Sequence, residues 1–257
     1  MNPNDTPGPE IPPNPATEPD TAVPAVAPPP LEEPLPENPD GKTLFEALLR
    51  RPGALADHLA KGESGKVTRL FAGIAVASFM LFGFVLGCFA KHEQLWASPL
   101  KVTVGMVIAG IICFPSLYIF TTLTGARVSL HQLGASLAGA LALAGLLLLG
   151  IAPAVWIFAE STNSLGFMGW LAMAAWLVSA GFALRFLKSM VAATGGRGKG
   201  PLTVWSVVFL LVSLQMTTSL RPILGRSDDF LTNEKKFFLQ HWAETSGESL
   251  PVEGSRR

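Results

Sequence analysis

The chain has 257 residues, and its 19 Lys and Arg balance its 19 Asp and Glu. The balance is uneven along the sequence, because residues 1–40 contain 14 prolines and 8 acidic residues but no Lys or Arg. The basic residues of the remainder flank long apolar runs, as expected beside anionic lipid headgroups, and this placement argues against a nucleic-acid partner.

Residues 1–41 are predicted to form a disordered, acidic tail. Proline at this density prevents helix and sheet, and the segment has no aromatic residue to build a core. It also lacks the basic start and the apolar stretch of a signal peptide. Two roles fit such a tail: a ligand for a protein partner that recognises proline-rich segments, or a solvated spacer.

Residues 42–66 are predicted to form a pair of short, basic, amphipathic helices. Thr43 and Glu46 have the spacing of a capping box, apolar residues follow at helical spacing, and Pro52 interrupts the pattern. We expect these helices to lie on the membrane surface. The alternative is that they dock onto a protein partner.

Residues 67–222 are predicted to form a transmembrane domain. The uncharged runs between bounding charges contain 21, 25, 28, 24 and 21 residues, and about 20 apolar residues suffice for one helix to cross a bilayer core. The sequence therefore predicts an all-α fold, a polytopic bundle of five transmembrane helices with amphipathic flanks. The runs are Leu70–Ala90, Val102–Ala126, Gln132–Ala159, Ser161–Leu184 and Gly200–Leu220.

Several positions in these runs are candidates for helix packing. Gly83 and Gly87 form a GxxxG pattern, which allows another backbone to approach closely. Pro115 is expected to kink the second run or to break its hydrogen-bond ladder. The third run has a slim face, suited to a central position, formed by Ala135, Ala138, Gly139, Ala142 and Gly145. Pro153 is expected to disrupt the far end of this run.

The most polar site within the runs is Gln215, which is followed by Thr217, Thr218 and Ser219. Its amide is expected to face another helix, either in an interhelical hydrogen bond or in the lining of a pore or lipid site. Arg221 and Pro222 complete the exit from the last run. Residues 223–257 form an extramembrane tail, in which Thr232–Trp242 has the pattern of a short amphipathic helix.

Lys and Arg counts predict the orientation. They are most numerous before the first run and between the fourth and fifth runs, and the third loop has none. The positive-inside rule then places the amino terminus in the cytoplasm, and five crossings place the carboxyl terminus outside. The predicted location is a cell membrane, specifically a bacterial inner membrane.

No motif for catalysis, metal binding or cofactor binding passes inspection. Gly198-Lys199 is followed by Gly200 where a phosphate loop requires Ser or Thr. His92-Glu93 begins like a zinc-protease motif, but Trp96 stands where the second His is required. Cys88 and Cys113 read as small core residues at different depths. The interiors of the runs contain no charged residue, which argues against a charge-coupled pump or voltage sensor.

The five closely spaced runs and the amphipathic lead-in resemble the Yip family of five-span membrane proteins. The exit Gln215-Met216-x-x-x-Leu220-Arg221-Pro222-x-x-Gly225 resembles a bacterial family of uncharacterised Yip-like inner-membrane proteins. The Asp-Leu-x-Gly-Pro motif of eukaryotic trafficking members is missing. The resemblance implies a membrane protein with no known catalytic residues.

Two classes of function follow from these features. The first is a membrane scaffold or interaction protein without catalytic activity, in contact with the bilayer and with a partner bound by the proline-rich tail. The second is a transporter or channel for a small solute or lipid, which predicts a cavity beside Gln215. The five runs show no inverted repeat, so a typical transporter fold is disfavoured.

Overall fold

A computed structural model describes residues 34–36, 38–61, 65–90, 94–162 and 164–219 of this chain. The chain divides into two units, Met1–Leu31 and Glu32–Arg257, and every described residue belongs to the second. Within the described part, all regular structure is helical, which confirms the all-α prediction. The helices are α1 (Gly41–Arg50), α2 (Pro52–Lys61), α3 (Gly65–Ala90), α4 (Gln94–Leu123), α5 (Leu130–Ser161), α6 (Leu165–Ala193) and α7 (Lys199–Ser219).

Four helices are long and apolar enough to cross a membrane, which makes this a multi-pass membrane protein. The segments that qualify are Gly65–Cys88, Ala97–Leu123, Leu130–Ser161 and Gly166–Ala193. In α7 the apolar stretch is Gly200–Met216. At about 1.5 Å per residue it extends over about 26 Å, slightly less than a bilayer core of about 30 Å.

The outer surface of these helices is strongly apolar, so it suits contact with lipid. On α4, for example, Ile111 is 65% exposed and Leu123 is 67% exposed. In water such a surface would be a liability, whereas lipid chains cover it without loss.

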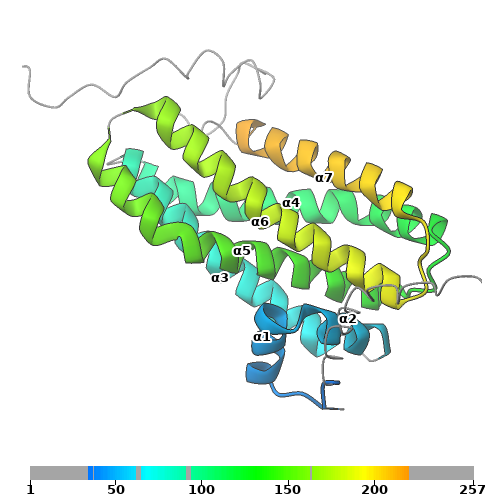
Figure 1. Cartoon of the computed structure of the whole chain (residues 1–257). Helices are drawn as coiled ribbons and strands as arrows, with labels where there is room; N and C mark the ends of the chain where they lie inside the picture. Colours follow the sequence, from blue (N-terminus) through cyan, green and yellow to red (C-terminus); the bar gives the residue numbers. More distant parts are fainter. Residues whose placement is uncertain (1–33, 37, 62–64, 91–93, 163, 220–257) are drawn as a thin grey trace, which may run out of the picture. The chain divides into compact units, whose positions relative to one another are not determined.

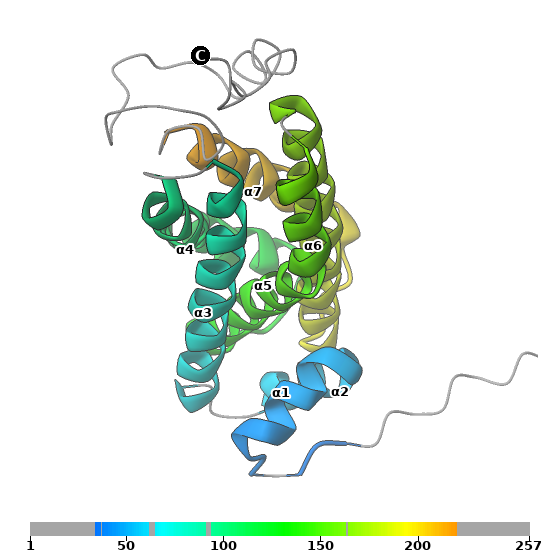
Figure 2. The same ribbon diagram turned by 90° about the vertical axis from the view of Figure 1, so that its left-hand side faces the viewer.

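The transmembrane helices run in alternating directions, and α5 lies at the centre of the bundle (Figures 1 and 2). It packs mainly against α3 and α6, while α3 also packs against α4, and α4 against α7. The slim face of α5 makes this possible. A Cβ atom built on Gly139 would lie 3.0 Å from Phe186 of α6 and 3.3 Å from Phe71 of α3.

Several helix ends differ from the uncharged runs. The second predicted run begins at Val102, but α4 begins at Gln94, so Lys101 lies inside the helix and inside a membrane-spanning segment. The expectation that the span interiors are free of charge is therefore wrong at this position. Likewise α6 continues through Arg185 and Lys188 to Ala193. Charges do not end these helices, because Lys and Arg are good helix formers.

Prolines do not end the helices either. Pro99 and Pro115 lie inside α4, and Pro153 lies inside α5, which continues to Ser161. A membrane helix tolerates proline where neighbouring groups satisfy the freed carbonyls. The predicted disruption of the third run at Pro153 is therefore wrong.

The amphipathic pair forms as predicted but begins differently. Helix α1 starts at Gly41 after the N-cap residue Asp40, which makes no side-chain capping bond, so Thr43 lies within the first turn. The predicted capping box at Thr43 is therefore wrong. Helix α2 starts at Pro52, a residue suited to the first helical position because its missing N–H would be unsatisfied there.

Candidate functional site

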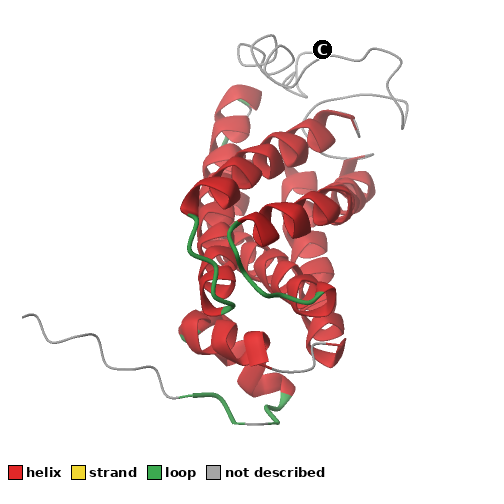
Figure 3. Ribbon diagram, turned by 90° about the vertical axis from the view of Figure 1, so that its right-hand side faces the viewer, coloured by secondary structure: helices red, strands yellow, loops and turns green. Residues whose placement is uncertain are grey.

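The end of the bundle that carries α1 and α2 holds the most elaborate set of contacts. The α4–α5 loop and the α6–α7 loop run side by side there (Figure 3). The backbone N–H of Arg127 donates to the carbonyl of Thr194 at 3.1 Å, and the N–H of Arg197 donates to the carbonyl of Thr124 at 3.1 Å. This reciprocal pair of hydrogen bonds, which we call the loop clasp, joins the two loops.

Both halves of the loop clasp have the same sequence pattern, Thr-Gly-x-Arg, at residues 124–127 and 194–197. The glycines Gly125 and Gly195 have φ angles of 81° and 89°, a left-handed conformation that favours glycine after a helix. Gly196 lies at the contact itself, where an added Cβ would be 2.7 Å from Thr124 Oγ1. Sequence reasoning missed this repeat, although the matched pattern 70 residues apart was a usable signal.

Helices α1 and α2 pack against this end of the bundle through their apolar stripe. Leu48 and Leu55 are fully buried and Leu59 is 2% exposed. The side chain of Gln132 ties the pair to α5, since its Nε2 donates to the carbonyl of Ala60 at 2.7 Å while its Oε1 accepts from the N–H of Ser129. The stripe therefore contacts the protein's own bundle, and the position of the pair relative to the membrane surface stays a prediction.

A second cluster joins α4 to α7. The indole N–H of Trp205, which is fully buried, lies 3.2 Å from the carbonyl of Cys113 and 3.1 Å from Ser116 Oγ. Ser116 Oγ itself donates to the Cys113 carbonyl at 2.8 Å. Pro115 lies between these two residues, and Trp205 stacks on Phe209 with ring centroids 5.2 Å apart. The helix with Pro115 is thus held by polar contacts from α7.

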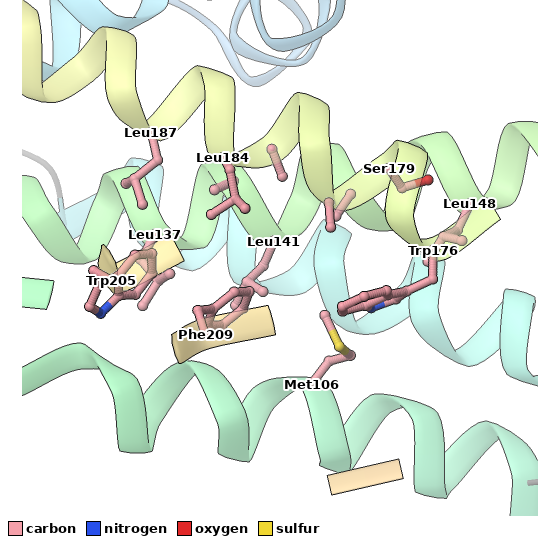
Figure 4. Close-up of a pocket in the computed structure, with 14 residues that line it drawn as sticks. Met106, Leu137, Leu141, Leu148, Trp176, Ser179, Leu184, Leu187, Trp205 and Phe209 are labelled. Carbon is pink, nitrogen blue, oxygen red and sulfur yellow. The ribbon is translucent and has the colours of Figure 1, made fainter. Parts of the chain in front are cut away.

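Trp205 and Phe209 of α7 also line a small apolar cavity of about 20 Å³, whose other lining residues come from α4, α5 and α6 (Figure 4). A cavity of this size holds about one water molecule, and apolar cavities stay dry. We call it the seam pocket. It extends from Leu187 and Trp205 to Trp176 and Leu148. Gln215 is not among the residues that line it, so it is not the cavity that the transport hypothesis predicts.

The remaining predicted positions are placed as follows. Gly83 of α3 faces α4 closely, since an added Cβ would be 2.6 Å from Pro99 Cα, and Gly87 is buried one turn further along. Gln215 is half-buried near the end of α7. Arg221 and Pro222, the side chains of Thr217 to Ser219 and the helix at Thr232–Trp242 lie outside the described residues. Cys88 and Cys113 are free thiols.

Lys101 is a polar residue that the sequence reading placed in a loop. It is only 5% exposed on α4, and Ser98, one turn earlier on the same helix, is fully buried. Ionisable residues in membrane helices usually mark functional positions. No group of three or more His, Cys, Asp or Glu that could hold a metal ion occurs among the residues that the structure describes.

No protein-family model, no curated protein and no solved structure matches this chain. The resemblance to Yip-like proteins therefore stays an untested prediction.

Proposed function

We propose that this protein is a non-catalytic membrane scaffold that presents residues 1–40 to a protein partner in the cytoplasm. In this proposal α3 to α7 form five crossings, with the carboxyl terminus outside. The bundle anchors the chain, α1 and α2 cap its cytoplasmic end, and the acidic proline-rich segment is the part that the partner recognises.

The observation that supports this proposal best is the attachment of the cap. The segment that precedes α1 joins a helix whose Leu48 is fully buried, and Leu35, five residues before Asp40, already packs against the core. The cap is tied to α5 by the bond between Gln132 and Ala60. A proline-rich segment would thus start from a fixed point on the bundle instead of a loose linker.

The charge of the capped end supports its cytoplasmic orientation. Exposed basic side chains gather at the helix ends and loops on this side, whereas Glu160 lies at the opposite end of α5. The positive-inside rule favours the cytoplasm for such a surface. The basic residues exposed at this end include Arg50, Lys61, Lys66, Arg69, Arg127, Arg185, Lys188 and Arg197.

A fifth crossing by α7 is supported by its length. The helix has 21 residues, which extend over about 31 Å. It packs along α4, which has a membrane-spanning segment of 27 residues. Because α7 lies beside a helix that spans the membrane, α7 is expected to cross the same thickness of the bilayer.

The proposal is tested by comparing the full chain with a variant that lacks residues 2–40, both purified from membranes in mild detergent. The full chain should retain a partner in constant stoichiometry, and the truncated chain should lose it. The cut is placed before α1, because removal of α1 and α2 would expose the part of the bundle surface that their leucines cover. Equal thermal midpoints of the two proteins would show that the bundle is intact.

Point variants make the test specific to the proline-rich character. Replacement of Pro28, Pro29 and Pro30 by alanine should release the partner, whereas the charge variant Glu32→Gln/Glu33→Gln should retain it. The scaffold proposal fails if no stoichiometric partner is found in several detergents, or if the truncated chain binds it as well as the full chain.

A further inference from the structure

The hairpins α4–α5 and α6–α7 are arranged as two copies of one unit. Each pair runs through a Thr-Gly-x-Arg loop, and the two loops bond reciprocally. The packing is reciprocal too, because α4 packs on α7 and α6 packs on α5. This is the pattern of two hairpins that run in the same direction and are related by a two-fold axis along the bundle. It is a parallel repeat, in contrast to the inverted repeat that the sequence lacks.

The two hairpins differ in what lies against them. Helix α3 packs against both α4 and α5. Among the described helices, none packs extensively against both α6 and α7, which also make few contacts with each other. The seam between α6 and α7 is therefore the open counterpart of a seam that α3 fills in the other hairpin.

The open seam is apolar along its depth. The seam pocket lies beneath this seam, and α6 contributes Leu184 and Leu187 to its lining while α7 contributes Trp205 and Phe209. Apolar side chains nearby on the same helices are exposed, among them Leu177 and Val207. An occupant of this seam must be apolar along its length, since an unsatisfied polar group is costly in hydrocarbon.

The charges at the end of the seam distinguish it from its counterpart. Arg185 and Lys188 are exposed on α6, each one residue beyond the pocket-lining Leu184 and Leu187. The equivalent positions of α4, 70 residues earlier, are Pro115 and Tyr118. Arg185 and Lys188 thus have no basic counterpart on α4, whereas Arg197 of the loop clasp has the exposed Arg127 as its counterpart. Arg197, in the loop between α6 and α7, adds a third exposed basic side chain.

We infer that the seam between α6 and α7 binds an anionic membrane lipid. One acyl chain lies along the exposed apolar side chains of α6 and α7, such as Leu177 and Val207, and the phosphate group lies near Arg185, Lys188 and Arg197. An apolar surface that ends in a basic cluster matches both parts of such a lipid. This inference does not rest on the proposed scaffold role or on a partner of residues 1–40.

The full-length protein is tested in vesicles of phosphatidylcholine that contain a minor fraction of lipid brominated on its acyl chains. Bromine quenches indole fluorescence at contact, and Trp176 and Trp205 both line the pocket. Brominated phosphatidylglycerol should quench more than brominated phosphatidylcholine at equal mole fraction. The additional quenching by brominated phosphatidylglycerol should fall when Trp176 is replaced by Phe.

The charge part of the site is tested by the variant Arg185→Gln/Lys188→Gln/Arg197→Gln. Its preference for phosphatidylglycerol should fall about tenfold or more, because each basic residue contributes severalfold to binding of an anionic surface. The matched control is Lys66→Gln/Arg69→Gln, which removes two exposed charges from α3. The control should keep most of the excess quenching.

Three results would overturn the inference. The first is equal quenching by the two brominated lipids, and the second is an equal loss in the charge variant and in the control. The third is protection of the seam by a second copy of the chain. This third result is detected with the variant Val207→Cys, made together with Cys88→Ser and Cys113→Ala. If a second copy covers the seam, the variant would form a disulfide-linked dimer in the membrane, and neither brominated lipid would quench Trp176.

Discussion

Gly196 lies where the two halves of the loop clasp meet, and it has no room for a side chain. A Cβ would be 2.7 Å from Thr124 Oγ1 and 2.8 Å from the Val191 carbonyl. Gly196→Ala is expected to reduce stability by about 1–3 kcal/mol. The measurement is the thermal midpoint in detergent. Gly200→Ala is the control, because nothing lies within 4 Å of its Cβ. Equal midpoints for the two variants would contradict the clasp geometry.

Ser179 is a buried residue whose loss is expected to help the fold. It is fully buried on α6, and its hydroxyl makes no hydrogen bond with a described residue. Since a buried hydroxyl without a partner costs about 1–3 kcal/mol, Ser179→Ala should raise stability or leave it unchanged. Ser213→Ala is the comparison, because Ser213 is equally buried but donates to the Phe209 carbonyl at 2.9 Å. A larger loss for Ser179→Ala in denaturant titration would refute this.

At the scale of residues, contacts within one helix could be predicted from the sequence better than contacts between helices. The sequence identified Pro115 as a special position in its helix, and Ser116 beside it donates to the carbonyl of Cys113. It missed Trp205, whose indole crosses from α7 to the same carbonyl. Such a contact depends on which helices become neighbours, and apolar membrane sequences carry little information about that, because every face is similarly apolar.

Gly83 determines how closely two helices approach. The backbone of α4 at Pro99 lies against it, so Gly83→Ala is expected to push α3 and α4 apart and to reduce stability by about 1–3 kcal/mol. Gly73→Ala, on the same helix, has nothing within 4 Å of its Cβ and should be neutral or stabilising, because alanine favours helix more than glycine does. The ratio of folded to unfolded protein in denaturant measures both. A stable Gly83→Ala variant would disprove the close approach.

The packing of α1 and α2 against the bundle can be tested with two adjacent leucines of α1. Leu48 is fully buried, whereas Leu49 is 45% exposed. Leu48→Ala should cost about 2–5 kcal/mol of local stability and increase amide hydrogen exchange throughout α1 and α2. Leu49→Ala should leave exchange in the pair nearly unchanged. The reverse ranking would show that the stripe of α1 faces lipid instead of the bundle.

At the scale of elements, the sequence predicted the amphipathic pair and the long apolar helices, but several helix ends could not be predicted. Reading runs between charges placed the start of the second span at Val102, although α4 begins at Gln94 and buries Lys101. The boundary rule assumed that a charge lies at the water interface. Burial within the protein removes that constraint, and only the tertiary structure shows where it applies.

At the scale of the whole molecule, the central claim is a polytopic bundle with its ends on opposite sides of the membrane. The sequence alone predicted the membrane environment, because helices built from runs of 21 to 28 uncharged residues match the thickness of a bilayer core. The only sequence signal for the repeat of two hairpins was the pair of Thr-Gly-x-Arg patterns, and the rest of the repeat lies in loop geometry within otherwise unlike sequences.

The most direct test of this claim is the labelling of single cysteines near the two ends of the chain in intact cells with a membrane-impermeant maleimide. The variants Thr6→Cys and Ser255→Cys are made separately, each with Cys88→Ser and Cys113→Ala. Five crossings predict that the cysteine at position 255 is labelled in intact cells and that the cysteine at position 6 is labelled only after lysis. Labelling of both positions under the same condition would indicate an even number of crossings and would contradict the account.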